Sequence, residues 1–215
     1  MAANNDCLPQ IHACAVRVTN LDSNGVPHPG ANSMYTTNAF TKITINPVYE
    51  DGTELSPKNA CDSPAFSYKG PSYFKRADFD IELINQDPYL AAMLGAGTVI
   101  TDGVVNGFAY PAIGVVDTNG VSIETWAKRI DAGDLHANYP YARWAIPKVK
   151  HLRIGSRDFS ATEQKNIFTG QALENVNWFD GPLNDWTVAS DRVAQWMPVA
   201  ALPASVCGPV AVAAS

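Results

Sequence analysis

The chain has 215 residues, a formal net charge of -6, 46% hydrophobic residues and only 17% charged residues. This length and hydrophobic content suit one β-rich domain, or one domain with long arms. The acidic balance and the lack of a Lys/Arg tract argue against nucleic-acid binding as the main task. The low charged fraction indicates that partners cover much of the surface, although a secreted β protein would have a similar composition.

The cysteine pattern argues against a zinc site and against a disulfide scaffold. No Cys-x-x-Cys pair and no histidine cluster occurs. The first six residues lack the basic and apolar regions of a signal peptide, so a reducing compartment with free or buried thiols is expected. The four cysteines are Cys7, Cys14, Cys61 and Cys207.

The first part of the chain indicates strands separated by projecting segments. Residues 11–19 are predicted to form a strand, followed by an Asn24-Gly25 turn. Residues 33–46 are predicted to form a second strand paired with the first, and the loop at about 20–40 is expected to project. Residues 46–72 are rich in Pro and Gly, which is typical of a functional loop or an interaction arm.

The segment 73–95 predicts a half-buried strand followed by a short helix. Apolar and acidic side chains alternate, which places them on opposite faces of a sheet. Asp87 suits the N-cap, Pro88 the first helical position and Gly95 the position past the end. A helix of about two turns must lie on a sheet to be stable. The inward set is Tyr73, Ala77, Phe79, Ile81 and Leu83, and the outward set is Asp78, Asp80 and Glu82.

The later chain adds strands and ends in an arm. Pro147 is expected to mark an edge or a bulge. The extended stretches are 98–101, 121–130, 139–154 and the start of 160–176, and 105–116 is expected to be a loop. Residues 198–215 are apolar, but repeated prolines and alanines predict an extended C-terminal arm rather than a membrane span.

Together these patterns predict a mainly β fold, a β-sandwich or β-barrel with one short flanking α-helix and long loops or arms. A single β-rich domain covers residues 1–197, with an N-terminal arm and projecting loops at about 20–40 and 46–72.

Three roles are open for the acidic row Asp78, Asp80 and Glu82. Its carboxylates could do acid/base work or hold a metal, they could form a solvated face, or they could line a surface that repels a passing polyanion. A solvated face is the simplest of the three. The histidines are scattered, and no nucleophile elbow, phosphate-binding loop or His-Glu-x-x-His motif occurs. We therefore expect no catalytic, cofactor-binding or metal-binding residues and no enzymatic activity.

The tryptophans fall into two groups. Trp126 and Trp144 lie in predicted strands and are expected in the core. The other three lie in irregular sequence, where they could stack on sugars or anchor contacts between subunits. They are Trp178, Trp186 and Trp196.

Several stretches carry a family resemblance over most of the chain. They are RVTNLD at 17–22, PVYEDG at 47–52, KNAC at 58–61, FKRADFDIE at 74–82, DP at 87–88, ARWAIPKV at 142–149, FTG at 168–170, NW at 177–178 and GP at 181–182. Their order resembles the major tail proteins, or tail tube proteins, of long-tailed actinobacterial phages.

The resemblance implies a structural virion protein of a non-contractile tail. Such subunits form hexameric rings that stack into the tube through which the genome leaves, and ring closure pairs neighbouring sheets into an inner β-barrel. Loops and terminal arms would bridge successive rings. The implied partners are further copies of the chain and the tape measure, tail terminator and distal tail proteins. DNA would pass through the lumen without specific binding. The implied location is the virion tail, with the host cytoplasm during assembly.

Within this reading, Asp78, Asp80 and Glu82 are the leading lumen-facing residues, and Trp178, Trp186 and Trp196 are candidate inter-subunit aromatics. A carbohydrate-binding β-sandwich, as a receptor-binding or decoration module, is the alternative that the stray tryptophans favour. A hydrolase built from dispersed Asp and His residues is a third reading that no local motif supports.

Overall fold

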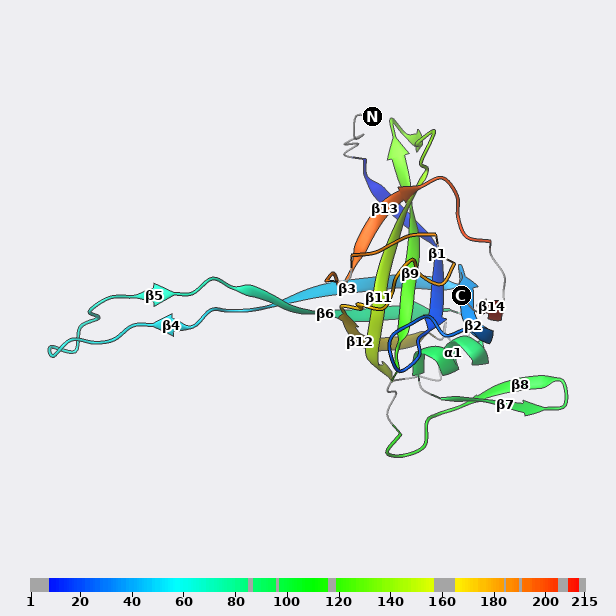
Figure 1. Ribbon diagram of the computed structural model, residues 1–215, viewed down its shortest axis with the longest axis horizontal. Helices are drawn as coiled ribbons and strands as arrows, with labels where there is room; N and C mark the ends of the chain where they lie inside the picture. The colour runs from blue at the N-terminus through cyan, green and yellow to red at the C-terminus, as the bar shows by residue number, and fades with distance from the viewer. Residues whose placement is uncertain are drawn as a thin grey trace.

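The computed structural model describes residues 8–84, 87–95, 97–115, 119–156, 165–183, 185–189, 191–204 and 209–212. Within these residues the chain forms fourteen strands and one short helix. A long arm, in which the chain runs out and back, leaves one side of the body, and a shorter hairpin leaves it near the helix (Figure 1).

One antiparallel sheet holds most of the strands. Its order is β14-β2-β1-β9-β11-β12-β6-β3, with β10 added on β9 and β13 on β11. The strands are β1 (Gln10–Asn20), β2 (Gly30–Thr37), β3 (Phe40–Glu50), β6 (Tyr73–Leu83), β9 (Val121–Asp131), β10 (Asp134–Leu135), β11 (Tyr141–Ile154), β12 (Asn166–Leu173), β13 (Gln195–Val199) and β14 (Pro209–Val212). Two small hairpins complete the set: β4 (Glu54–Leu55) with β5 (Tyr68–Lys69), and β7 (Thr98–Asp102) with β8 (Val105–Ala109).

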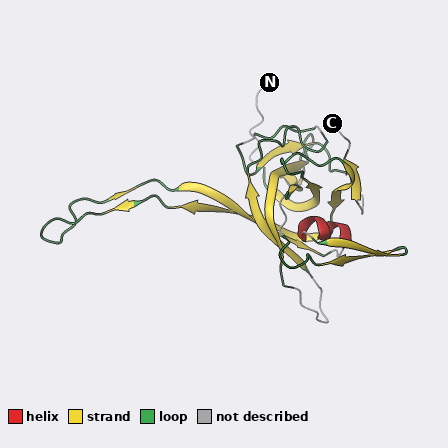
Figure 2. Cartoon of the chain, turned by 60° about the horizontal axis from the view of Figure 1, so that its bottom comes forward, coloured by secondary structure: helices red, strands yellow, loops and turns green. Residues whose placement is uncertain are grey.

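The sheet folds over on itself around one apolar core. Val16 and Val18 of β1 and Phe79 of β6 belong to the same buried cluster, although their strands lie far apart in the sheet order. Figure 2 shows the sheet curling around this core. Among the described residues its end strands, β14 and β3, do not pair with each other, so no closed barrel forms. The mainly β, sandwich-like prediction is confirmed.

The helix α1 (Pro88–Gly95) forms as its sequence indicates. The Asp87 carboxylate accepts hydrogen bonds from the backbone N–H groups of Tyr89 at 2.9 Å and Leu90 at 3.1 Å, which satisfies donors that have no partner inside the helix. Leu90 and Leu94 are fully buried in the core, so tertiary packing stabilises this two-turn helix. It packs against β7, β8, β11 and β1.

The alternation predicted for β6 is confirmed along most of the strand. Ala77, Phe79, Ile81 and Leu83 are buried, and the acidic residues between them are partly exposed. Tyr73 was placed on the inward face, and this is wrong: its side chain is 55% exposed. The reason is position, because Tyr73 is the first residue of β6, and β6 begins in the arm before it enters the body (Figure 1).

The prediction of one strand over 33–46 paired with the first strand is wrong. The chain turns after Thr37, whose hydroxyl accepts a hydrogen bond from the Ala39 N–H at 3.0 Å, and this separates β2 from β3. β2 pairs with β1, whereas β3 pairs with β6. Residues 20–40 therefore do not project as a loop, because 30–37 lie in the main sheet. A run of β-branched residues shows that a strand forms but not which partner it takes.

Three further segments differ from the sequence interpretation or refine it. β11 is one strand with a register shift between Ile146 and Val149, so the bulge expected at Pro147 is present. Residues 105–109, expected in a loop, pair with β7. In the segment expected as a C-terminal arm, β13 runs to Val199 and β14 pairs with β2. Pro209 opens an edge strand, a position that tolerates its missing N–H.

Candidate functional site

The most prominent feature outside the body is the arm formed by residues 50–73. β3 and β6 continue past the body as an antiparallel ribbon, and the chain between them runs out to a distant tip that carries β4 and β5 (Figures 1 and 2). Within the described chain the arm therefore packs on little besides itself.

Polar pairs fix the root of the arm. The Asp51 carboxylate accepts hydrogen bonds from the Ser72 hydroxyl at 2.8 Å and from Lys69 at 3.3 Å, and these contacts lower its pKa. The Glu50 carboxylate lies 2.6 Å from the Lys75 ammonium, which lowers the pKa of Glu50. Both pairs are exposed, so they orient the ribbon more than they stabilise it.

Two glycines allow the strands of the arm to approach closely. A Cβ on Gly52 would lie 2.4 Å from the backbone of Gly70, a distance that real Cβ atoms do not reach. The Gly70 N–H donates to the Thr53 carbonyl at 3.1 Å across the same point. Glycine at position 52 is therefore a steric requirement of the ribbon.

The arm exposes apolar side chains that no described part of the chain covers. Leu55 is 51% exposed, Phe66 57% and Tyr68 56%. At the root, Tyr49 and Phe74 pack edge to face with ring centroids 5.8 Å apart, yet both stay exposed. Exposed apolar groups concentrated on one projecting element mark an interaction surface.

A second apolar surface lies on the β7–β8 hairpin and the residues after it. Exposed fractions are 55% for Ile100, 99% for Val104, 67% for Val105 and 56% for Tyr110. The hairpin projects from the body beside α1 (Figure 1). Asp102 is the sole charged residue of 98–109, so an apolar partner surface would suit it.

The main sheet also has open edges. β3 and β14 are its two ends, and each has one neighbour within the described residues. Unpaired N–H and C=O groups along such an edge form a template for a strand from another chain. The sheet can therefore be extended at either end.

The acidic row on β6 faces away from the core, as predicted. Asp78 accepts from Arg76 at 2.9 Å, and Glu82 accepts from the Thr41 hydroxyl at 3.1 Å. Among the described residues the Asp80 carboxylate has no hydrogen-bond or ion-pair partner. Cross-strand neighbours place Thr44 on one side of Asp80 and Thr169 on the other.

The face that carries this row has mixed charge, which the sequence analysis missed. The registry places Lys42 of β3 beside Glu82, and Lys150 and Arg153 of β11 beside the β12 residues that flank Asp78 and Asp80. The carboxylates therefore form a central stripe between basic borders. On this face the carboxylates alone would repel a polyanion, and the basic residues beside them would weaken that repulsion at short range.

The three candidate inter-subunit tryptophans differ in exposure. Trp178 is 1% exposed and packs with Ala145 and Val188 in a small core of its own, so its assignment to a subunit contact is wrong. Trp186 packs partly buried against that core. Trp196 is 45% exposed and stacks on Trp144, with ring centroids 6.2 Å apart. Only Trp196 presents much ring surface to a partner.

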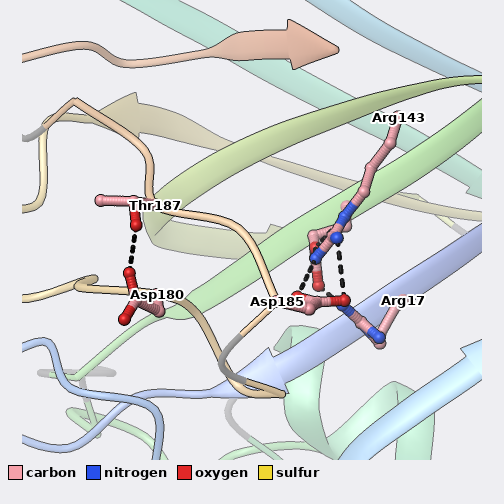
Figure 3. A network of polar contacts seen from close by, with 6 residues as sticks. Arg17, Arg143, Asp180, Asp185 and Thr187 are labelled. Atoms are coloured by element: carbon pink, nitrogen blue, oxygen red, sulfur yellow. Dashed lines mark hydrogen bonds and ion pairs between the residues drawn. The ribbon is translucent and has the colours of Figure 1, made fainter. Parts of the chain in front are cut away.

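A buried ionic network lies on the face of β1, β9 and β11 that points away from the main apolar core (Figure 3). The Glu124 side chain is 1% exposed and accepts from Arg17 Nε at 2.5 Å and from Arg143 Nε at 2.7 Å. Arg143 also donates two parallel hydrogen bonds of 2.9 Å to the Asp185 carboxylate. Burial would lower the pKa of Arg143, but Glu124 and Asp185 outweigh it and raise that pKa.

Aromatic rings flank these guanidinium groups. The guanidinium carbons of Arg17 and Arg143 lie 5.2 Å and 5.5 Å from the Trp126 ring centroid. That of Arg143 also lies 5.2 Å from the Trp186 centroid. Sequence reasoning missed this network. Charged residues in the middle of otherwise apolar strands were a usable signal, because such residues are buried almost only when paired.

The described residues contain no group of three or more His, Cys, Asp or Glu side chains that could hold a metal ion. In the same part of the chain, no helix is both long and apolar enough to cross a membrane. Of the four cysteines, Cys14 and Cys61 are free thiols, and Cys7 and Cys207 lie outside the described residues. Neither a protein-family model nor a curated protein sequence matches the chain.

Proposed function

We propose that the protein is a self-assembling structural subunit, a tail tube protein whose copies form stacked rings around a channel for DNA. The observation that carries the proposal is the arm. A ribbon that exposes Leu55, Phe66 and Tyr68 so far from its own core would be stabilised by contact with another copy.

Two further observations support assembly with copies of the same chain. The main sheet is open at β3 and β14, and edge-to-edge pairing between copies would satisfy the unpaired backbone groups of both. The β7–β8 hairpin adds a separate apolar surface on another side of the body. A ring needs a contact on each of two sides of a subunit, and a stack needs one contact above and one below. The two open edges of the sheet, the arm and the β7–β8 hairpin are four such features.

The acidic stripe on β6 is the candidate wall of the channel. Its basic borders and two ion pairs, Asp78 with Arg76 and Glu82 with Lys165, make this assignment narrower than the sequence suggested, because they offset part of the repulsion of DNA. Asp80 is the residue of choice for testing it, since it has no partner among the described residues and its replacement should leave the fold intact.

A carbohydrate-binding module is the second candidate, and Trp196 is the observation that favours it. Sugar binding usually needs an exposed aromatic platform, and Trp196 supplies one ring. The burial of Trp178 and the partial burial of Trp186 remove two of the three rings on which that candidate depended.

An arm deletion tests the proposed function. Replacing residues 54–69 with a two-residue turn joins the ribbon where Thr53 and Gly70 are already hydrogen bonded, so the body should fold. We expect the full chain to form tubes in negative-stain electron microscopy and the deletion to form none. The proposal would be overturned if the deletion variant still formed tubes. It would also be overturned if the full chain stayed monomeric and bound glycans on an array.

A further inference from the structure

The buried ionic network is a row of alternating charge that ends on a cation. From the surface inward the order is Asp185, Arg143, Glu124 and Arg17, and each neighbouring pair is joined by the hydrogen bonds described above. Asp185 is 43% exposed, whereas the side chains of Glu124 and Arg17 are 1% and 3% exposed. The next group along the row, beyond Arg17, would be an anion.

Arg17 uses little of its hydrogen-bonding capacity. A guanidinium has five N–H donors, and in the described chain Arg17 donates from Nε alone. Its Nη2 atom is buried and has no partner among the described residues. Leaving a charged donor buried and unpaired is costly, so an acceptor at this position would be strongly favoured. The Nη1–Nη2 edge matches the two oxygens of a carboxylate.

Arg17 lines a cavity of about 450 Å³ on this face of the sheet. This volume lies within the usual range for small-molecule sites, about 300–1,000 Å³. The lining also includes Trp126, Arg143 and the more exposed Asp185. Apart from Thr36, the other lining residues are apolar and include Met34, Leu202, Pro203 and Val210.

We propose that this cavity binds a small molecule that carries one carboxylate on a short apolar body. Because Nη2 has almost no accessible surface in the free protein, the Arg17 guanidinium would turn toward the cavity to give the carboxylate two hydrogen bonds. The apolar body would then lie against Leu202 and Pro203. A monoanion fits better than phosphate, because Glu124 and Asp185 already place two negative charges nearby and the remaining wall is apolar. The site does not depend on assembly into a tube.

Hexanoate is a suitable probe. Acetate, which lacks the apolar body, and hexanamide, which lacks the charge, are the two controls. Titration calorimetry gives the affinity, and tryptophan fluorescence reports directly on the cavity through Trp126. We expect saturable binding of hexanoate that is tighter than that of acetate, hexanamide or inorganic phosphate.

Two substitutions should move the affinity in opposite directions. Arg17→Met removes the anion partner and should weaken hexanoate binding by about tenfold or more, the size of a lost charge-assisted hydrogen-bond pair. Asp185→Asn removes an anion from the cavity lining and frees Arg143, so it should tighten binding. Asp191→Asn, at an exposed ion pair that does not line the cavity, is the matched control and should leave the affinity unchanged.

Three outcomes would overturn the proposal. They are absence of saturable hexanoate binding, preference for phosphate or hexanamide, and equal affinities in the wild type and the Asp185→Asn variant. If Arg17→Met does not fold, Arg17→Lys keeps the charge but loses the planar fork and should still weaken binding. The Asp185→Asn variant then tests the proposed binding independently of any Arg17 substitution.

Discussion

Removal of the Glu124 carboxylate is the sharpest perturbation of the body. Glu124 is 1% exposed and accepts N–H groups from both Arg17 and Arg143. Glu124→Ala would leave two buried guanidinium groups with Asp185 as their one remaining counter-charge within the network. Breaking a buried ion pair by removing one partner costs about 3–5 kcal/mol, because an uncompensated charge stays in a poorly solvated site.

That cost is a large share of the stability of a domain. Folded domains are stable by about 5–15 kcal/mol, so the variant is expected to be marginal at room temperature. At about 2–4 °C per kcal/mol for a domain of this size, the melting temperature should fall by roughly 6–20 °C.

Urea denaturation of the dispersed subunit, followed by tryptophan fluorescence and circular dichroism, measures the loss. The transition midpoint should fall with little change in the slope. Asp191→Ala is the control, since Asp191 and Arg192 form an exposed pair with side chains 66% and 63% exposed, and its effect should lie within about 0.5 kcal/mol. A Glu124→Ala variant within about 1 kcal/mol of wild type would refute the reasoning.

A combined replacement separates stability from binding. Arg17→Met, Glu124→Leu and Arg143→Met together remove every buried charge of the row, and such apolar replacements are often neutral or stabilising. The triple variant should therefore be more stable than Glu124→Ala and should not bind hexanoate. A triple variant that is less stable than Glu124→Ala would show that the charges are needed for folding itself.

Three further outcomes follow from local geometry. Trp178→Ala should cost about 3–5 kcal/mol in urea denaturation, because the ring is 1% exposed and its loss opens a cavity, and an effect typical of a surface residue would contradict this. Gly120→Ala should cost about 1–3 kcal/mol, since Gly120 has a φ of +82° and a Cβ there would lie 2.5 Å from the Val149 carbonyl oxygen. Lys75 lowers the pKa of Glu50 below its ordinary value of 4.5. The ion pair should therefore be complete above pH 4.5 and be lost as the pH falls through the lower pKa of the folded state. A carboxyl NMR titration with its midpoint at or above 4.5 would count against the contact.

Local signals explain what the sequence could predict. The alternation of Phe79 and Ile81 with Asp80 is a period of two within one strand, and the capping of α1 by Asp87 involves residues two and three positions away. Such patterns are encoded in neighbouring residues.

Contacts between distant residues explain what the sequence could not predict. Arg17 and Glu124 are 107 positions apart, and Trp178 is buried by Ala145 and Val188 from other parts of the chain. The choice of β6 rather than β1 as the partner of β3 is likewise a property of the sheet. Residue types in one segment restrict such pairings without determining them.

Averaged cryo-electron microscopy images of the purified full chain, viewed along the channel axis over a range of concentrations, test the central claim most directly. The account predicts closed rings of six copies around an open channel, with the arm of each copy resting on the next ring. Monomers or small oligomers without a channel at every concentration would contradict it.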